Sequence, residues 1–571
     1  MFLNKNYNNL FSTANIFLWP LVVFVVFFIT FIIVNGGPIT NDELKYLALS
    51  LDTTQEPRIL NRYFHIYFQK FFVYYLNDPF VGMQIFWSFI ISSTAALTFY
   101  SAILISNSKS LAIGFLSLLF LLIQPLIFRF NGVTYADYTV MLILALSMAI
   151  YVSTDMNSLR SKSKSIFILS ALLILSIKSK ETGIVNIIFI IGIIASNLKI
   201  SSIFRLSLCG VIGILSGIFL MALLDAFILG DYLFSWRFSN IEQLFSFNSG
   251  GRERVIGNWY SLISETDLII PFFLYLLSLP YIIDKEKPSH IKFLYLLPIF
   301  IVLFLTITSG FGRLRIVPRY IVPIIPIISI LAANYIQLSG VSIINKLKLS
   351  KRSFFWSIIF VIFLMSVAYF LRNTSNLINL NGWTPRLFLS NIFYPMVISL
   401  ILIFYIFLKK NSNAYKVLFL SLFVISILPP LIAIPNNVLF SGKLFDSRIY
   451  PLETFRNNLK INKNTVLILS GGTLGFSGGL IPFYFDVKIS CSDRGNKYPI
   501  LCASDENKKI YSNYFNDDGM VGKDGRFDYA ILTINKYEQY WETSYPSDTY
   551  NIIRDDDKKY VLICKNKICN K

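Results

Sequence analysis

The sequence predicts a polytopic α-helical membrane protein of about 13 spans with a small C-terminal extracytoplasmic α/β domain. Hydrophobic residues make up 55% of the chain, aromatic residues make up 16%, and mean hydropathy is +0.60. Values this high are typical of integral membrane proteins. Long apolar runs recur as far as Pro435, so we expect a membrane part over 1–435 and a separate tail over 436–571.

The apolar runs set the number of spans, because a helix needs roughly 20 apolar residues to cross about 30 Å of hydrocarbon. The first run is followed by no A-x-A cleavage site, so we expect an uncleaved anchor. The fifth and sixth are short and are separated only by the polar residues 178–182. The thirteen candidates lie near 16–34, 83–105, 111–128, 134–153, 165–177, 183–195, 203–229, 268–284, 293–309, 321–338, 354–371, 387–408 and 417–435.

The net charge of +19 comes mainly from loops between spans. Lys and Arg number 19 against 16 Asp and Glu in the tail, but 32 against 16 in the membrane part. We therefore expect no nucleic-acid partner. With a cytoplasmic N-terminus, basic residues are denser in the inner loops, as the positive-inside rule requires. Thirteen spans then place the C-terminus outside the cytoplasm.

The tail has the pattern of a small extracytoplasmic α/β domain. A helix is expected over 452–459, followed by β-rich runs at 465–470, 487–491, 527–534 and 559–564. Four of the five cysteines lie in this tail, which suggests disulfides in an oxidising compartment. Three connectivities are open, and close spacing favours 491–502 with 564–569. The disulfide candidates are Cys491, Cys502, Cys564 and Cys569.

Two outer loops are long, 35–82 and 230–267, and long ordered loops are usually functional. The first contains the adjacent carboxylates Asp42 and Glu43 just past the first span, where acidic groups near lipid are costly. It continues with an aromatic stretch, 63–80, whose charged interruptions suit helices lying in the membrane interface. The acidic pair could also be an ordinary solvated loop.

Further charged residues stand at the outer ends of predicted spans, against the topological rule. Asp137 enters the fourth span within Tyr-Ala-Asp-Tyr, and it could be a solvated helix cap or a site carboxylate. The basic residues could anchor the spans by snorkelling or could bind an anion. They are Lys178, Lys180, Arg319, Arg58, Arg62 and Arg313.

Several of these motifs together resemble a GT-C-fold glycosyltransferase, of the bacterial protein-mannosyltransferase and aminoarabinose-transferase type. They are the acidic motif Asp-Glu-Leu-Lys-Tyr at 42–46, the break Lys-Ser-Lys-Glu at 178–181, and Arg-Tyr-x-x-Pro-x-x-Pro at 319–326. In the tail a strand and glycines precede Pro-Phe-Tyr-Phe at 482–485. The Lys-Pro-Pro element of the aminoarabinose branch is replaced near Glu56-Pro57-Arg58, so the resemblance does not extend to lipid A as the acceptor.

The resemblance implies an integral-membrane enzyme of the bacterial inner membrane. It would move a sugar from a polyprenyl-phosphate donor to an extracytoplasmic lipid, glycan or protein acceptor. Inverting transfer needs a carboxylate base and cations that stabilise the phosphate leaving group. We assign the base to Asp42, with Glu43 and Asp137 orienting the acceptor or holding a divalent ion, and the donor phosphate to the six basic residues above.

Other assignments stay open at this point. His65, one of two histidines, could join Glu43 and Asp137 as a metal ligand or could be a surface residue. No cofactor is required by any motif, although a divalent metal ion is compatible with the carboxylates. The alternative functions are an O-antigen ligase or polymerase type of transferase and a lipid or polysaccharide transporter. Transporters place polar groups at the bilayer midplane, whereas here Asp225 is the main ionisable residue inside a span.

Overall fold

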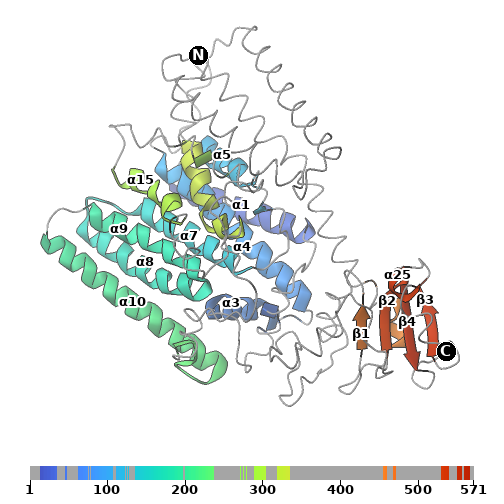
Figure 1. The fold of residues 1–571 in the computed structure, drawn as a ribbon. Coiled ribbons are helices and arrows are strands. Elements are labelled where there is room, and N and C mark those ends of the chain that lie inside the picture. The colour runs from blue at the N-terminus through green and yellow to red at the C-terminus, as the bar shows by residue number, and fades with distance from the viewer. Residues whose placement is uncertain are drawn as a thin grey trace, which may run out of the picture.

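The computed structural model consists of a helical body and a small C-terminal sheet (Figure 1). It describes residues 13–236 with gaps that include 35–45 and 51–61, parts of 271–303, and residues 318–334. In the tail it describes parts of 450–459, the stretches 467–470 and 529–538, and 550–565 with a gap at 556–558. The predicted spans at 354–371, 387–408 and 417–435 lie outside the described residues, as does most of the one at 268–284, and the total of 13 stays a prediction.

The described helices follow the apolar runs of the sequence. Three of them are long and apolar enough to cross a membrane, namely Phe80–Ile105, Ala136–Ser153 and Ile200–Leu229, and shorter apolar helices accompany them. The larger helices are α1 (Thr13–Val34), α3 (Tyr63–Tyr74), α4 (Pro79–Ile105), α5 (Leu111–Leu122), α7 (Ala136–Ser153), α8 (Leu159–Ser179), α9 (Ile187–Ala195) and α10 (Ile200–Leu229).

Helices α4 and α7 form the centre of the body. Both are mostly buried along their length and pack against each other, whereas α1 packs on the opposite side of α4. Large side chains such as Trp87 and Tyr138 are buried between these helices. A helix that is apolar all round is expected in such a position.

The predicted short spans at 165–177 and 183–195 correspond to a longer helix and a shorter helix, with a break between them. Helix α8 ends at Ser179, and the chain then makes the 3₁₀ helix η2 (Glu181–Asn186) before α9 begins. The break folds tightly onto α8, because a Cβ at Gly183 would lie 2.3 Å from the carbonyl carbon of Ser176. Only glycine allows this approach, which keeps the polar break at the end of α8.

Helix α10 packs closely on α8 and leaves its other side exposed. A Cβ at Gly213 would lie 2.3 Å from the Phe167 carbonyl oxygen, so a small residue is needed for the two backbones to approach. Large apolar side chains such as Phe204, Leu215 and Phe219 are exposed on α10. Because this helix is also long enough to span, the exposed apolar side is suited to contact lipid.

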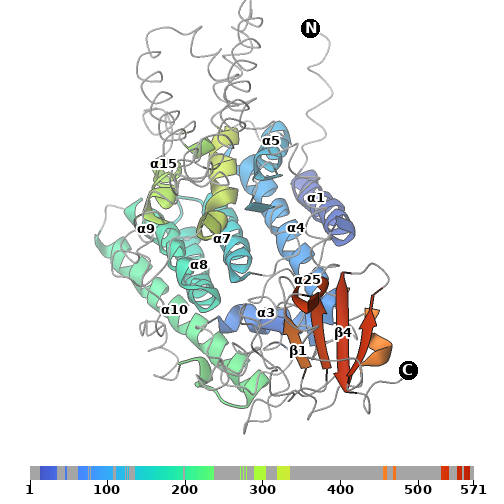
Figure 2. The same cartoon turned by 45° about the vertical axis from the view of Figure 1, so that its right-hand side comes forward.

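Helix α3 lies across the end of the body rather than along it (Figures 1 and 2). It contacts α4, α8 and α10, and its buried residues include Tyr63, His65 and Tyr67. One helix is thus present in the stretch 63–80 where the sequence predicts interfacial helices. In both views the sheet lies near the same end of the body as α3.

Later segments complete the described part of the body. The short helix α15 (Ser289–Phe293) precedes an apolar segment that runs to Ile301. The 3₁₀ helix η5 (Pro318–Ile324) then continues as an α-helix to Asn334, and η5 packs against α7. The Arg-Tyr-x-x-Pro motif therefore begins a helix, as its sequence predicts.

The tail contains a mixed sheet whose described strands have the order β1-β2-β4-β3. Strand β1 (Leu467–Ser470) is parallel to β2 (Tyr529–Thr533), whereas β4 (Tyr560–Lys565) is antiparallel to β2 and to β3 (Tyr550–Arg554). Alternate residues of β2 and β4, including Leu532 and Ile563, form its buried core.

Three predicted strands correspond to β1, β2 and β4, but β3 is missing from the prediction. The expected run at 487–491 lies outside the described residues. The helix expected over 452–459 is described only as the 3₁₀ turn η7 (Arg456–Asn458) and adjacent residues. Strand β3 is held by its hairpin with β4, in which the Asp555 carboxylate accepts bonds from the backbone N–H groups of Lys559 and Tyr560 at 2.7 and 3.0 Å.

Candidate functional site

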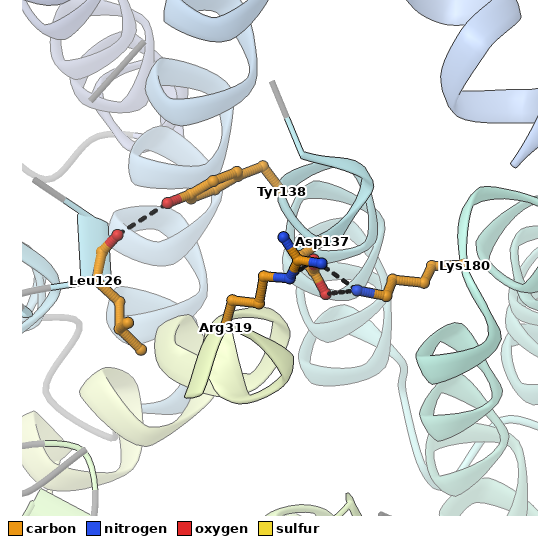
Figure 3. Close-up of polar contacts among 5 residues, drawn as sticks. All are labelled: Leu126, Asp137, Tyr138, Lys180 and Arg319. Atoms are coloured by element: carbon orange, nitrogen blue, oxygen red, sulfur yellow. Dashed lines mark hydrogen bonds and ion pairs between the residues drawn. The ribbon is translucent and has the colours of Figure 1, made fainter. Parts of the chain in front are cut away.

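Three charged residues that the sequence places at span ends meet at one end of the helical body (Figure 3). Helices α7 and α8 are neighbours joined by a short turn, so the start of α7 and the end of α8 lie at the same end. Asp137 is in the first turn of α7, Lys180 follows the last residue of α8, and Arg319 begins η5. We call Asp137, Lys180, Arg319 and the nearby Arg62 the cation cluster.

The centre of the cation cluster is a buried ion pair. The Lys180 ammonium donates to both carboxylate oxygens of Asp137, with Nζ 2.6 Å from Oδ1 and from Oδ2. Both residues are 1% exposed. Each is also favoured by its helix, since a carboxylate suits the N-terminal turn of α7 and an ammonium suits the C-terminal end of α8. Tyr138 fixes the start of α7 by donating to the Leu126 carbonyl oxygen at 2.8 Å (Figure 3).

Arg319 approaches the same carboxylate from η5. Its Nε lies 3.9 Å from Asp137 Oδ2, and its guanidinium carbon lies 4.3 Å from the ring centre of Tyr135. The Lys180 Nζ lies 3.9 Å from the ring centre of Tyr320, the residue after Arg319. Aromatic faces attract cations, most strongly where water is excluded. The two tyrosines therefore supplement the carboxylate in holding the cations.

Arg62 brings a third cation to the cluster from the start of α3. Its carbonyl accepts the backbone N–H of Ile66 at 3.1 Å, so it caps the helix. The side chain is 8% exposed, its guanidinium carbon lies 5.5 Å from the ring centre of Tyr46, and its Nε has no hydrogen-bond partner. The hydroxyl of Tyr46 is also buried without a hydrogen-bond partner. Buried donors are usually hydrogen-bonded. The unpaired Arg62 Nε and Tyr46 hydroxyl are therefore consistent with a site whose ligand would bond them.

The charges of the cluster act on Lys180, which lies in the polar break outside the apolar segments on either side. Burial lowers the pKa of its ammonium to about 8, and the Asp137 carboxylate opposes this decrease. The charges of Arg62 and Arg319 lower the pKa further, and that of Glu181 raises it. Three cations and two carboxylates thus share one environment, which keeps a positive excess. An arriving anion would favour the protonated lysine.

Lys178, predicted to act with Lys180, points elsewhere. Its Nζ donates to the Ser235 carbonyl oxygen at 2.6 Å and lies 3.8 Å from the ring centre of Trp236. Both residues belong to the 3₁₀ helix η3 (Phe234–Trp236), at the start of the loop 230–267. The structure therefore brings Lys180, Arg319 and Arg62 together with Asp137, but gives Lys178 a different environment.

His65 has a hydrogen-bond partner in α7 rather than in a cluster of metal ligands. Its Nδ1 lies 2.7 Å from the Thr139 hydroxyl, and its ring packs edge-on against Tyr46 with centroids 5.0 Å apart. Within the described residues, no group of three or more His, Cys, Asp and Glu could hold a metal ion. Glu43 lies outside the described residues, so the candidate set of Glu43, Asp137 and His65 stays a prediction.

Several predicted site residues fall outside the described residues. They are Asp42, Glu43, Arg58 and Arg313, with the cysteines Cys491, Cys502 and Cys569. Cys564 is described on β4, where it is buried and forms a disulfide. Its partner lies beyond the described stretches, so the pairing stays a prediction. The membrane-embedded cysteine, Cys209, is free.

Sequence reasoning missed the aromatic part of the site. Tyr135 and Tyr320 stand two residues before Asp137 and directly after Arg319, and both line the cluster. Their positions beside charged residues at span ends are a signal that could have identified them. Asp225 was singled out as an ionisable residue inside a span, but sequence patterns do not predict the turn that brings it to Ser235, the residue that Lys178 also bonds.

Comparison with known proteins supports the architecture. No protein-family model matches the chain, and no curated protein matches it. A solved structure does match, the crystal structure of ArnT from Cupriavidus metallidurans bound to undecaprenyl phosphate. The two structures align with a TM-score of 0.56 and 14% sequence identity, covering 98% of this chain and 100% of ArnT. At this identity the likeness concerns the fold, and it supports a GT-C-like polytopic membrane fold for this chain.

Proposed function

We propose that this chain is an integral-membrane glycosyltransferase of the bacterial inner membrane. It moves a sugar from a polyprenyl-phosphate donor to an extracytoplasmic lipid, glycan or protein acceptor. The observation that carries this proposal is the cation cluster. Arg62, Lys180 and Arg319 come from three separate segments and converge near one buried carboxylate at one end of the helical body.

The composition of the cluster suits a phosphate. The positive excess attracts an anion, and guanidinium groups bind phosphate through paired N–H donors. Arg62 has an Nε with no hydrogen-bond partner, so one such donor is available before a ligand arrives. A lipid ligand also fits the position, because the cluster lies at the ends of apolar helices. Its phosphate would meet the cations while its chain remains in the bilayer.

The similar structure supports the choice of lipid. ArnT from Cupriavidus metallidurans was solved with undecaprenyl phosphate, and its fold covers nearly all of this chain. A sugar linked to that carrier, or to another polyprenyl phosphate, is therefore the donor class that we propose. The proposal names the sugar and the acceptor by chemical class.

The proposed reaction is an inverting displacement. The Asp42 carboxylate takes the proton of the acceptor hydroxyl, whose oxygen attacks the anomeric carbon of the sugar. The bond between that carbon and the phosphate oxygen breaks, and its electron pair leaves with the polyprenyl phosphate. The cation cluster stabilises this negative charge. Glu43 orients the acceptor, and a divalent ion held at the acidic motif would serve the same purpose. Asp137, paired with Lys180, sets the position of the cations.

Binding and transfer test the proposal with one purified protein. Detergent-solubilised protein should bind undecaprenyl phosphate and not the matched neutral alcohol undecaprenol, as tryptophan fluorescence can show. The protein should also release polyprenyl phosphate from at least one member of a panel of polyprenyl-phosphate hexoses and pentoses in the presence of cell-envelope acceptors. Equal binding of both lipids would contradict the phosphate site. Selective binding without transfer would instead favour a lipid transporter.

A further inference from the structure

A second buried network lies beside the cation cluster and is centred on Asp225, near the end of α10. Its Oδ1 accepts the Tyr67 hydroxyl at 2.7 Å, and its Oδ2 accepts the Ser235 hydroxyl at 2.6 Å and the Ser235 backbone N–H at 3.0 Å. The Lys178 ammonium reaches the other side of the same residue, the Ser235 carbonyl oxygen. Asp225 is fully buried and Lys178 is 2% exposed.

The two charges of this network compensate each other through one residue, Ser235. Burying a single ionised side chain is strongly unfavourable, so a buried carboxylate and a buried ammonium need each other and further hydrogen bonds. Here Ser235 donates to Asp225 and accepts from Lys178, and the Trp236 ring covers the ammonium at 3.8 Å. The pair therefore fixes the turn η3 between α8 and α10.

The same network fixes α3, which Arg62 directly precedes. Tyr67 bonds Asp225, and Tyr63, one helical turn earlier, packs edge-on against Phe234 of η3 with centroids 5.8 Å apart. Residues four apart share one face of a helix, so one face of α3 is seated on α10 and η3. On α8, Lys178 lies two residues before Lys180. Two of the three cations in the cluster are thus held by segments that this network ties together.

We propose that Asp225 and Lys178 form a positioning pair that sets Arg62 and Lys180 at the separation needed to bind a lipid phosphate. Lys178 is then not a phosphate ligand, in contrast to its neighbour Lys180. This inference rests on the proposed function, because it assigns the pair a role in that site. The observed contacts favour positioning over direct binding, since the ammonium is buried against Ser235 and Trp236.

The test compares the single variants Asp225→Asn and Lys178→Met with the double variant that carries both. Each single change removes one of the two buried charges and its effect on the other, whereas the double change removes both charges. We therefore expect each single variant to bind undecaprenyl phosphate about ten- to a hundredfold more weakly, the range for a lost charge-assisted hydrogen bond. The double variant should recover binding to within about threefold of wild type, because coupled residues deviate from additivity.

Hydrogen exchange measured by mass spectrometry on the same proteins checks the mechanism. In both single variants, exchange should rise at 63–74 and 231–236, and it should return towards wild type in the double variant. Tyr67→Phe should weaken lipid binding as well, by removing one bond to Asp225. Tyr151→Phe is the matched control, since it removes a similar bond, to the His290 carbonyl oxygen at 2.7 Å, at the far end of α7; it should leave lipid binding unchanged.

Three results would overturn the inference. Loss of binding in Lys178→Met that the added Asp225→Asn fails to relieve would make Lys178 a direct ligand. Normal binding in both single variants, with raised exchange, would make the network purely structural. Equal effects of Tyr67→Phe and Tyr151→Phe would show that the loss is not specific to α3. The wild-type protein separately tests the proposed function, because its failure to bind the lipid would contradict that function and not the pairing of the two charges.

Discussion

Lys180 donates to both carboxylate oxygens of Asp137 at 2.6 Å, although the two residues are 43 positions apart in the sequence. The bond joins the end of α8 to the start of α7 in the buried interior. Around this pair, Arg319 lies 3.9 Å from the same carboxylate, and the Nε of Arg62 has no hydrogen-bond partner. The cluster keeps a positive excess, so Lys180 and the two arginines together can hold an anionic ligand.

The first prediction concerns the stability of this ion pair. Asp137→Asn leaves Lys180 buried beside two arginines with no carboxylate partner on α7, so the free energy of unfolding should fall by about 3–5 kcal/mol. Lys180→Met should destabilise less, because Arg319 already lies 3.9 Å from Asp137 and can approach it. Thermal unfolding of the detergent-solubilised variants measures the difference.

The double variant Asp137→Asn with Lys180→Met is the matched control for this prediction. It buries neither charge, so its melting temperature should exceed that of Asp137→Asn alone. Transfer activity should nevertheless stay low, since a phosphate-binding cation has been removed. A Lys180→Met protein less stable than Asp137→Asn would contradict the assignment of Arg319 as the second partner.

The second prediction separates function from stability at Arg62. Its guanidinium is near Lys180 and Arg319 and has no carboxylate within the described contacts, so Arg62→Gln should leave the melting temperature unchanged or raise it. The same change should weaken binding of undecaprenyl phosphate by about ten- to a hundredfold, because a charge-assisted bond to the ligand is lost. Arg205→Gln, on the exposed start of α10, is the matched control.

Arg319→Gln should also weaken lipid binding, but at some loss of stability, because it removes a cation beside Asp137. Fluorescence titration with undecaprenyl phosphate and thermal unfolding distinguish the two arginines. If Arg62→Gln and Arg205→Gln bound the lipid equally well, the ligand phosphate would not reach the start of α3.

Sequence patterns predicted the members of the cluster better than its internal contacts. Charged residues at span ends are recognisable because they oppose the expected membrane pattern, and this identified Asp137, Lys180, Arg319 and Arg62. Which cation meets which carboxylate depends on helix packing, which sequence spacing does not show. Lys178 illustrates this limit. It stands only two residues before Lys180, but its side chain points towards η3 and not towards Asp137.

In the fold, too, elements set by apolar length were predicted, whereas elements set by tertiary contacts were not. Long apolar runs predicted α4, α7 and α10 almost to their ends, since hydrophobic length is a direct requirement for spanning. Strand β3 was missed because its short sequence, Tyr-Asn-Ile-Ile-Arg, is weakly patterned and is stabilised mainly by pairing with β4. A break such as η2 also depends on tertiary contact, as the approach of Gly183 to Ser176 shows.

The third prediction is a pH dependence that originates at Lys180. Because the pKa of its ammonium is lowered to about 8, the cation is present below that pH and is lost as the pH rises through it. Binding of undecaprenyl phosphate should therefore weaken above about pH 8, a range in which the lipid phosphate, with a second pKa of about 6, no longer changes charge. Titrations at several pH values measure the midpoint.

Asp137→Asn gives this prediction a direction that can be checked. The carboxylate raises the pKa of Lys180, so its removal should move the midpoint to lower pH. Arg205→Gln should not move it. A midpoint that is unaffected by Asp137→Asn would assign the pH dependence to another group.

The fourth prediction is the topology that the sequence suggests. A reporter fused after Lys571 should be active only outside the cytoplasm, because thirteen spans starting from a cytoplasmic N-terminus end on the outer side. Single cysteines introduced into 154–164, which comprises the turn between α7 and α8 and the start of α8, should be labelled only from the cytoplasmic side. Labelling of that turn from outside would invert the helical body and place the cation cluster at the cytoplasmic face.

The last prediction concerns the base. A general base must be ionised and must come within hydrogen-bond distance of the acceptor oxygen, and Asp42 stands in a predicted outer loop beside the first span, where both conditions can hold. Asn is nearly isosteric with Asp, so Asp42→Asn should leave folding, membrane insertion and binding of undecaprenyl phosphate intact. Transfer should nevertheless fall by about a hundredfold or more, the usual contribution of a general base.

Glu43→Gln is the matched comparison, and it should reduce transfer less than Asp42→Asn if Glu43 only orients the acceptor. A dead Glu43→Gln enzyme beside an active Asp42→Asn enzyme would exchange their roles. Lipid binding separates this site from the cation cluster, because neither acidic variant should alter it, whereas Arg62→Gln should. Full transfer by both acidic variants would move the base elsewhere. Asp137 would be a poor replacement, since its carboxylate is already bound on both oxygens by Lys180.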